Sequence, residues 1–145
     1  MLYVDTSSLV KGYIDEAGSP EVRAHLTDQD FVVTSALTLV EAHSAFSRAR
    51  FATSSPLSTD RYQAAIEAFE TSWRNFILVS PTETIIRGAA DLAATRQLRA
   101  YDAVHLASAI WFRAEIGALD ILVHDGALRR AAIAEGFDVF PAMNP

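Results

Sequence analysis

The sequence contains no cysteine. That absence excludes disulfide frameworks, thiolate nucleophiles and cysteine-ligated zinc or iron–sulfur centres. Long apolar runs are missing too, since no segment approaches the ~18 continuous apolar residues that suggest a membrane-spanning helix. The N-terminus also lacks a basic stretch followed by an apolar core, the pattern of a secretory signal peptide. We therefore expect a cytoplasmic protein that does not associate with a membrane.

Several common functional motifs are absent as well. No G-x-S-x-G, G-x-G-x-x-G or Walker A pattern occurs. The sequence therefore lacks the usual markers of serine hydrolases, dinucleotide-binding enzymes and P-loop NTPases. The four histidines show no paired metal-binding spacing such as H-E-x-x-H. His105 lies three residues after an acid, but a hydrogen-bonded histidine packed between helices explains it at least as well.

Positive charge is also in short supply. The 145 residues include 12 Lys and Arg against 18 Asp and Glu, which gives a formal charge of −6. This balance argues against indiscriminate attraction to nucleic acid or to an anionic membrane. With 50% apolar and 21% charged residues, the composition is that of a globular protein. The length suits one domain, so we expect residues 1–145 to form a single domain.

Five short apolar segments have the continuous pattern of strands buried on both faces of a parallel sheet. They are residues 2–4, 31–34, 76–79, 121–123 and 137–140. The segments between them carry apolar residues at helical spacing. Helices are predicted over residues 19–26, 38–50, 58–75, 82–97, 101–115 and 126–135. Strands that alternate with helices predict an α/β fold with a mostly parallel sheet.

Four acidic residues occupy places where strands end or helices begin. Asp5 and Asp125 follow predicted strands, while Glu41 and Asp102 stand near helix N-termini, which reach the same edge of such a sheet. Each also has a structural explanation. The two aspartates after strands suit helix caps, Thr38 and Glu41 fit a capping box, and Asp102 favours a helix dipole.

Considered together, the four carboxylates indicate a metal site. Crowded in one cleft, they would repel one another and raise each other's pKa values unless a cation neutralised them. Oxygen ligands without a His or Cys partner suit a hard ion such as Mg²⁺ or Mn²⁺. Magnesium keeps several waters and accepts substrate phosphate oxygens, so the pattern favours phosphate chemistry.

Three stretches, residues 5–11, 38–48 and 98–109, resemble the successive motifs of PIN-domain ribonucleases, in particular the VapC toxins of type II toxin–antitoxin systems. The resemblance covers essentially the whole chain, and the order of the motifs makes it specific. It implies a three-layer α/β/α PIN-like domain with a central, mostly parallel sheet of about five strands. It further implies Mg²⁺- or Mn²⁺-dependent cleavage of RNA, a homodimer, and inhibition by a small VapB-like antitoxin protein.

The resemblance assigns catalysis and metal binding to four matching positions, Asp5, Glu41, Asp102 and Asp125. It gives Thr6 or Ser7 the role of the hydroxyl that supports the metal shell. Val123 stands where the family often has Thr or Ser, so direct and water-mediated contact of Asp125 with the metal both stay open. Arg99, Arg129 and Arg130 are candidates for bidentate contacts to RNA phosphates, beside the alternative of a solvated surface.

Two other functions remain open from the sequence. A haloacid-dehalogenase-like Mg²⁺ phosphatase also has an aspartate directly after its first strand. It needs a second acid two residues later, however, and this chain has Ser7 at that position. A catalytically inactive binding module could keep the fold without the activity. The presence of all four acids argues against that second alternative.

Overall fold

The computed structural model describes residues 1–142. Five strands form one sheet with the spatial order β3-β2-β1-β4-β5, and every neighbouring pair is parallel. The strands are β1 (Leu2–Val4), β2 (Val32–Ser35), β3 (Ile77–Val79), β4 (Asp120–Leu122) and β5 (Val139–Phe140). The α/β class and the parallel sheet predicted from the sequence are therefore confirmed.

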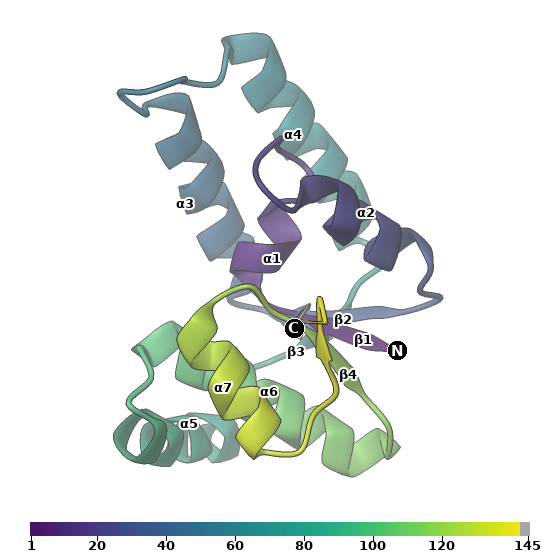
Figure 1. Cartoon of the computed structure of the whole chain (residues 1–145), viewed down its shortest axis with the longest axis vertical. Coiled ribbons are helices and arrows are strands. Elements are labelled where there is room, and N and C mark those ends of the chain that lie inside the picture. The colour runs from purple at the N-terminus through teal and green to yellow at the C-terminus, as the bar shows by residue number, and fades with distance from the viewer. Residues whose placement is uncertain (143–145) are drawn as a thin grey trace.

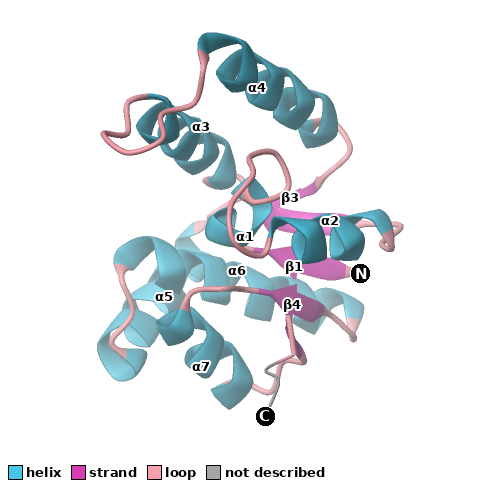
Figure 2. Ribbon diagram, turned by 45° about the horizontal axis from the view of Figure 1, so that its top comes forward, coloured by secondary structure: helices cyan, strands magenta, loops and turns pink. Residues whose placement is uncertain are grey.

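Within the described residues, seven helices surround this sheet. They are α1 (Thr6–Val10), α2 (Ser19–Thr27), α3 (Thr38–Arg50), α4 (Thr59–Trp73), α5 (Glu83–Arg96), α6 (Ala100–Ile116) and α7 (Gly126–Ala134). Figures 1 and 2 show α1 to α4 on one side of the sheet and α5 to α7 on the other, so the structure has the three layers of an α/β/α fold. Among residues 1–142, no helix has both the length and the apolar character needed to cross a membrane.

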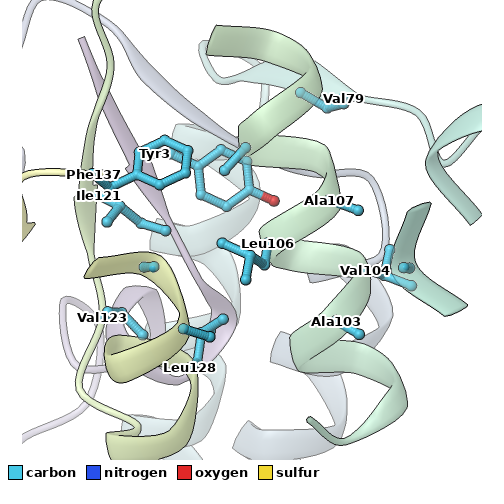
Figure 3. Packing of buried hydrophobic residues seen from close by; sticks show 14 of the residues in the cluster. Tyr3, Val79, Ala103, Val104, Leu106, Ala107, Ile121, Val123, Leu128 and Phe137 are labelled. Atoms are coloured by element: carbon cyan, nitrogen blue, oxygen red, sulfur yellow. The ribbon is translucent and has the colours of Figure 1, made fainter. Parts of the chain in front are cut away.

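Alternate residues of each strand build the two halves of the core. Tyr3, Val33 and Ile121 point to the layer of α5, α6 and α7, where they pack with Leu106 and Leu128 (Figure 3). Leu2, Val4 and Leu122 point to the opposite layer and pack with Phe46 and Phe69. Because both faces of each central strand are buried, these strands are mostly apolar and do not alternate between apolar and polar residues.

The helix starts follow local capping rules. Ser58 and Thr82 accept hydrogen bonds from backbone amides at the starts of α4 and α5. A serine directly before Pro20 is typical of a helix N-cap, but the cap of α2 is Gly18, which has a positive φ of 88°. Ser19 is the first helical residue, and its hydroxyl donates to the carbonyl oxygen of Ile14, which holds the preceding loop.

Two other expectations need correction. The five-residue helix α1 was not among the predicted helices because it is too short to show a helical period. The predicted strand over residues 137–140 is paired only at Val139 and Phe140. Phe137 is buried in the core instead, where the guanidinium of Arg113 lies 3.8 Å from its ring centroid.

The strand order places a switch in chain direction beside β1. From β1 the chain winds outward through β2 to β3, and it then returns to the other side of β1 to form β4 and β5. In open parallel sheets, ligands bind beyond the carboxyl ends of the strands at such a switch point. The segments that follow β1 and β4 therefore mark the place where a functional site is expected.

Candidate metal and phosphodiester site

A cleft of about 600 Å³ lies at this switch point. Its walls come from α1, α3, the start of α6 and the loop after β4, and they include Thr6, Ser7, Glu41 and Asp125. Of the other two predicted acids, Asp5 is only 4% exposed and Asp102 is half-buried, and neither belongs to the cleft lining that the described residues form. The structure thus brings segments from four separate parts of the chain to one edge of the sheet.

Asp5 and Asp125 are both helix caps. Asp5 accepts hydrogen bonds from the backbone amides of Ser7 and Ser8 at 3.1 and 3.2 Å, and the Ser7 hydroxyl also donates to it. Oδ1 of Asp125 accepts the amides of Ala127 and Leu128 at 2.8 and 2.9 Å. Both amides use the same oxygen, so the cap leaves Oδ2 of Asp125 for another partner.

Glu41 does not form the capping box that the sequence suggested. The N-cap position of α3 is Leu37, which makes no side-chain cap. Oε2 of Glu41 instead accepts the Thr6 hydroxyl at 2.6 Å and lies 2.9 Å from Nε2 of His105. Tertiary partners from α1 and α6 therefore replace the local one, and both of them use Oε2, which leaves Oε1 for another partner.

These contacts shape the ionisation of Glu41. Burial alone would raise the pKa of its carboxyl group, but the hydrogen bonds from His105 and Thr6 outweigh burial and lower the pKa. Glu41 is accordingly an ionised carboxylate at neutral pH, as a ligand of a cation must be.

Asp102 behaves in the opposite way. Burial raises its pKa, and the negative charges of Asp125 and Asp5 raise it further. Asp102 therefore lies within electrostatic reach of both Asp125 and Asp5. A bound cation would offset this repulsion.

The donor set fits a hydrated divalent cation. Within residues 1–142, no group of three acidic or histidine side chains already converges as the ligands of one ion. The carboxylates available are hard oxygen donors, however, and burial together with the charges of Asp125 and Asp5 raises the pKa of Asp102. Mg²⁺ usually keeps several waters and takes few protein carboxylates, so this open arrangement suits it better than a closed cage would.

Positive side chains also line the cleft, and the sequence identified only some of them. Arg99, Lys11 and Arg48 lie on its wall, and the ring of His124 lies there too. Arg48 lies seven residues after Glu41, two turns along α3, and this spacing is visible in the sequence. Burial and the charge of Lys11 lower the pKa of His124, which favours its neutral form.

The other two arginine candidates lie elsewhere. The guanidinium of Arg129 is directed to the carbonyl oxygens of Val123 and Val139, at 3.5 and 3.4 Å. Arg130 lines a separate hollow beside Arg96. Neither side chain is part of the cleft wall as the described residues form it.

His105 is the residue of the site whose role the sequence indicated least clearly. Its ring is buried and hydrogen-bonded, as expected, but its partners are Tyr3, Thr6 and Glu41. The spacing of three residues from Asp102 on one helix was the available signal, because residues three apart share a helix face.

The chain is similar to known proteins in its sequence. A model of the PIN domain matches residues 2–133. Ribonuclease VapC45 of Mycobacterium tuberculosis is 33% identical over 144 residues, which cover 98% of this chain and 96% of that protein.

Two solved structures share the fold at lower identity. The FitAcB structure from Neisseria gonorrhoeae has 19% identity and a TM-score of 0.65, and the match covers 97% of this chain and 96% of that one. A toxin–antitoxin complex from Klebsiella pneumoniae has 15% identity and a TM-score of 0.62, and the match covers 86% and 87% of the two chains.

Proposed function

The chain belongs to the PIN-domain family and within it to the VapC group, and from that premise we propose that it is a divalent-metal-dependent endoribonuclease, the toxin of a VapBC-type pair. One observation supports the proposal most strongly. Burial together with the charges of Asp125 and Asp5 raises the pKa of Asp102 beside a cleft at the sheet's switch point. Such shifts are concentrated at functional sites.

We assign the cation, Mg²⁺ or Mn²⁺, to the four acids Asp5, Glu41, Asp102 and Asp125. Oε1 of Glu41 and Oδ2 of Asp125 are the oxygens that the contacts described above leave for it. When bound, such an ion lowers the pKa of a coordinated water and stabilises negative charge on a phosphodiester. Thr6 holds Glu41, and the Ser7 hydroxyl holds Asp5, so both hydroxyls orient carboxylates.

The substrate strand would lie along the positive side of the cleft. Lys11, Arg48 and Arg99 line it together with the acids, so backbone phosphates can pair with cations while the scissile bond faces the carboxylates. Lys11 now pairs with Glu16 at 3.1 Å, and a phosphate would have to displace that partner. Arg129 and Arg130 would contact RNA only beyond the cleft wall.

The proposal includes an antitoxin partner and a second copy of the chain. The fold is shared with a protein solved as a toxin–antitoxin complex, which supports a small VapB-like antitoxin. Val40 and Phe51 on and after α3 are 71% and 76% exposed, and they give such a partner apolar contacts near the cleft. For a homodimer, the candidate contact surface is an apolar groove between α5 and α6, which contains Leu92, Ile110 and Trp111. We also propose that residues 1–145 act as one domain in the cytoplasm.

The test is a cleavage assay on antitoxin-free protein. Total RNA is incubated with the protein and Mg²⁺ or Mn²⁺, and a parallel reaction contains EDTA. We expect fragments with a restricted set of ends that require the metal. Failure to cleave any RNA with either metal would favour the inactive binding module, while hydrolysis of a phosphate monoester such as p-nitrophenyl phosphate without RNA cleavage would favour the phosphatase.

A further inference from the structure

His105 connects three elements that meet below the cleft. It lies on α6 and is 2% exposed. Nδ1 of its ring is 3.1 Å from the hydroxyl of Tyr3 on β1, and Nε2 is 2.9 Å from Oε2 of Glu41 on α3. Tyr3 is fully buried, and Figure 3 shows its hydroxyl directed toward the helix that carries Leu106 and Ala107. Nδ1 therefore faces β1, while Nε2 faces both Glu41 on α3 and, at 3.1 Å, the Thr6 hydroxyl on α1.

The contacts determine where the protons lie. An ionised glutamate only accepts hydrogen bonds, so Nε2 of His105 must carry a proton to pair with Oε2 of Glu41. A neutral imidazole with its proton on Nε2 has an acceptor at Nδ1, and the Tyr3 hydroxyl donates to it. The opposite tautomer would place a nitrogen lone pair against the carboxylate, which is repulsive.

The Thr6 hydroxyl lies beside two buried threonine hydroxyls. It donates to Oε2 of Glu41 at 2.6 Å, and Oγ1 of Thr38 lies 3.3 Å away. Thr34 donates to the carbonyl oxygen of Val4 on β1, so the 2.7 Å contact between Thr38 and Thr34 uses the proton of Thr38. Thr38 is fully buried and packs against the Thr6 hydroxyl, which leaves the single proton of Thr6 for Glu41.

We propose that His105 is a positioning residue for Glu41: its Nε2–H joins the Thr6 hydroxyl on Oε2 and so turns Oε1 to the cleft, while the Tyr3 hydroxyl donates to Nδ1 and supports the tautomer that makes this contact. The inference rests on the proposed function, because it gives Oε1 of Glu41 to the cation. Groups that hold a ligand carboxylate or histidine in this way typically contribute 10–100-fold to metal affinity.

The first measurement reads the tautomer without any metal. Long-range ¹H–¹⁵N NMR at about pH 8.5, well above the ordinary histidine pKa of ~6.5, distinguishes the two ring nitrogens. We expect the wild-type spectrum to show His105 protonated at Nε2, and Tyr3→Phe to keep that proton because Glu41 still accepts from Nε2, with the Nδ1 resonance shifted by the loss of its donor. A wild-type ring with an unprotonated Nε2 overturns the inference, whether or not the protein cleaves RNA.

The second measurement is the affinity of the protein for Mn²⁺ in the absence of RNA. Water-proton relaxation is the readout of Mn²⁺ binding. His105→Phe keeps a planar ring but has no donor, and we expect its Mn²⁺ affinity to fall about 10–100-fold. His105→Gln can restore an N–H near the position of Nε2, and we expect it to recover most of the loss. Tyr3→Phe should weaken binding less than His105→Phe does.

Controls keep the two proposals separate. His25 lies beside Phe140 and away from the cleft. The variant His25→Gln should therefore bind Mn²⁺ as the wild type does. Circular-dichroism melts establish that each variant is folded, and Tyr3→Phe gives the answer if His105→Phe does not fold. A folded His105→Phe with wild-type Mn²⁺ affinity contradicts the positioning role. A wild-type protein that binds no Mn²⁺ contradicts the proposed function, and the tautomer measurement then decides the Glu41 contact by itself.

Discussion

Asp102 lies within electrostatic reach of Asp125: burial first, and then the negative charge of Asp125, raises the pKa of Asp102 above its ordinary value of 3.8. The two residues come from the start of α6 and the end of β4, so the sheet topology itself creates the repulsion. The folded protein without a bound cation is therefore less stable at neutral pH than it would be if Asp102 carried no charge.

This repulsion predicts a pH dependence of stability. A carboxyl group whose pKa is raised on folding contributes stability at pH values below its unfolded pKa, and the contribution is lost as the pH rises through the folded pKa. We expect Asp102→Asn to raise the melting temperature of the metal-free protein at pH 7, and the difference from wild type to shrink toward pH 3. Asp91→Asn, at an exposed acid on α5, is the control and should show no such trend.

Metal binding should stabilise the fold. At a free Mg²⁺ or Mn²⁺ concentration of 100 times the dissociation constant, a ligand that binds only the folded state contributes about 2.7 kcal/mol. Thermal melts with increasing Mn²⁺ should therefore shift upward, and EDTA should reverse the shift. In Glu41→Gln the same titration should give a smaller shift, and an equal shift would remove Glu41 from the metal site.

The two roles of Asp5 can be separated by the choice of substitution. Asparagine caps helices about as well as aspartate, whereas alanine at such a position costs about 0.5–2 kcal/mol. We expect Asp5→Asn to keep nearly wild-type stability in urea unfolding and Asp5→Ala to lose about 1 kcal/mol. Both should lose RNA cleavage. Retained cleavage in Asp5→Asn would mean that the residue serves only as a cap.

The aromatic cluster that holds α3 and α4 to the sheet predicts a large stability effect. Phe69 is fully buried, and its ring centroid lies 5.7 Å from that of Phe46 and 5.4 Å from that of Tyr13. Phe69→Ala should cost about 3–5 kcal/mol in denaturant unfolding. The matched control is Phe51→Ala, because this ring is 76% exposed and its loss should change stability by no more than about 0.5 kcal/mol.

The sequence predicted the parallel sheet because its central strands are apolar on both faces, as Leu2, Tyr3 and Val4 show. It predicted a common edge for the acids because the alternating topology places Asp5 and Asp125 at strand ends. It could not predict the partners of Glu41. The capping-box pattern is local, and Thr6 and His105 reach Glu41 only through tertiary packing across 35 and 64 positions of the chain.

The positive side of the cleft was also hard to predict. Lys11, Arg48 and Arg99 lie on different helices or at their ends, and no spacing along the chain links them. Arg129 and Arg130 follow Asp125 closely in sequence, yet α7 turns their side chains away from the cleft wall. Proximity in sequence to a strand end is a weaker guide than the direction of a helix face.

The most direct test of the central claim is the single-turnover rate of RNA cleavage in Mg²⁺ for the wild type, Asp102→Asn and Asp91→Asn. If the four acids form the metal site, the Asp91→Asn rate should equal the wild-type rate. Asp102→Asn should lose more than the ~10–100-fold expected of a residue outside the ligand shell. Cleavage by a folded Asp102→Asn variant at the wild-type rate would contradict the account.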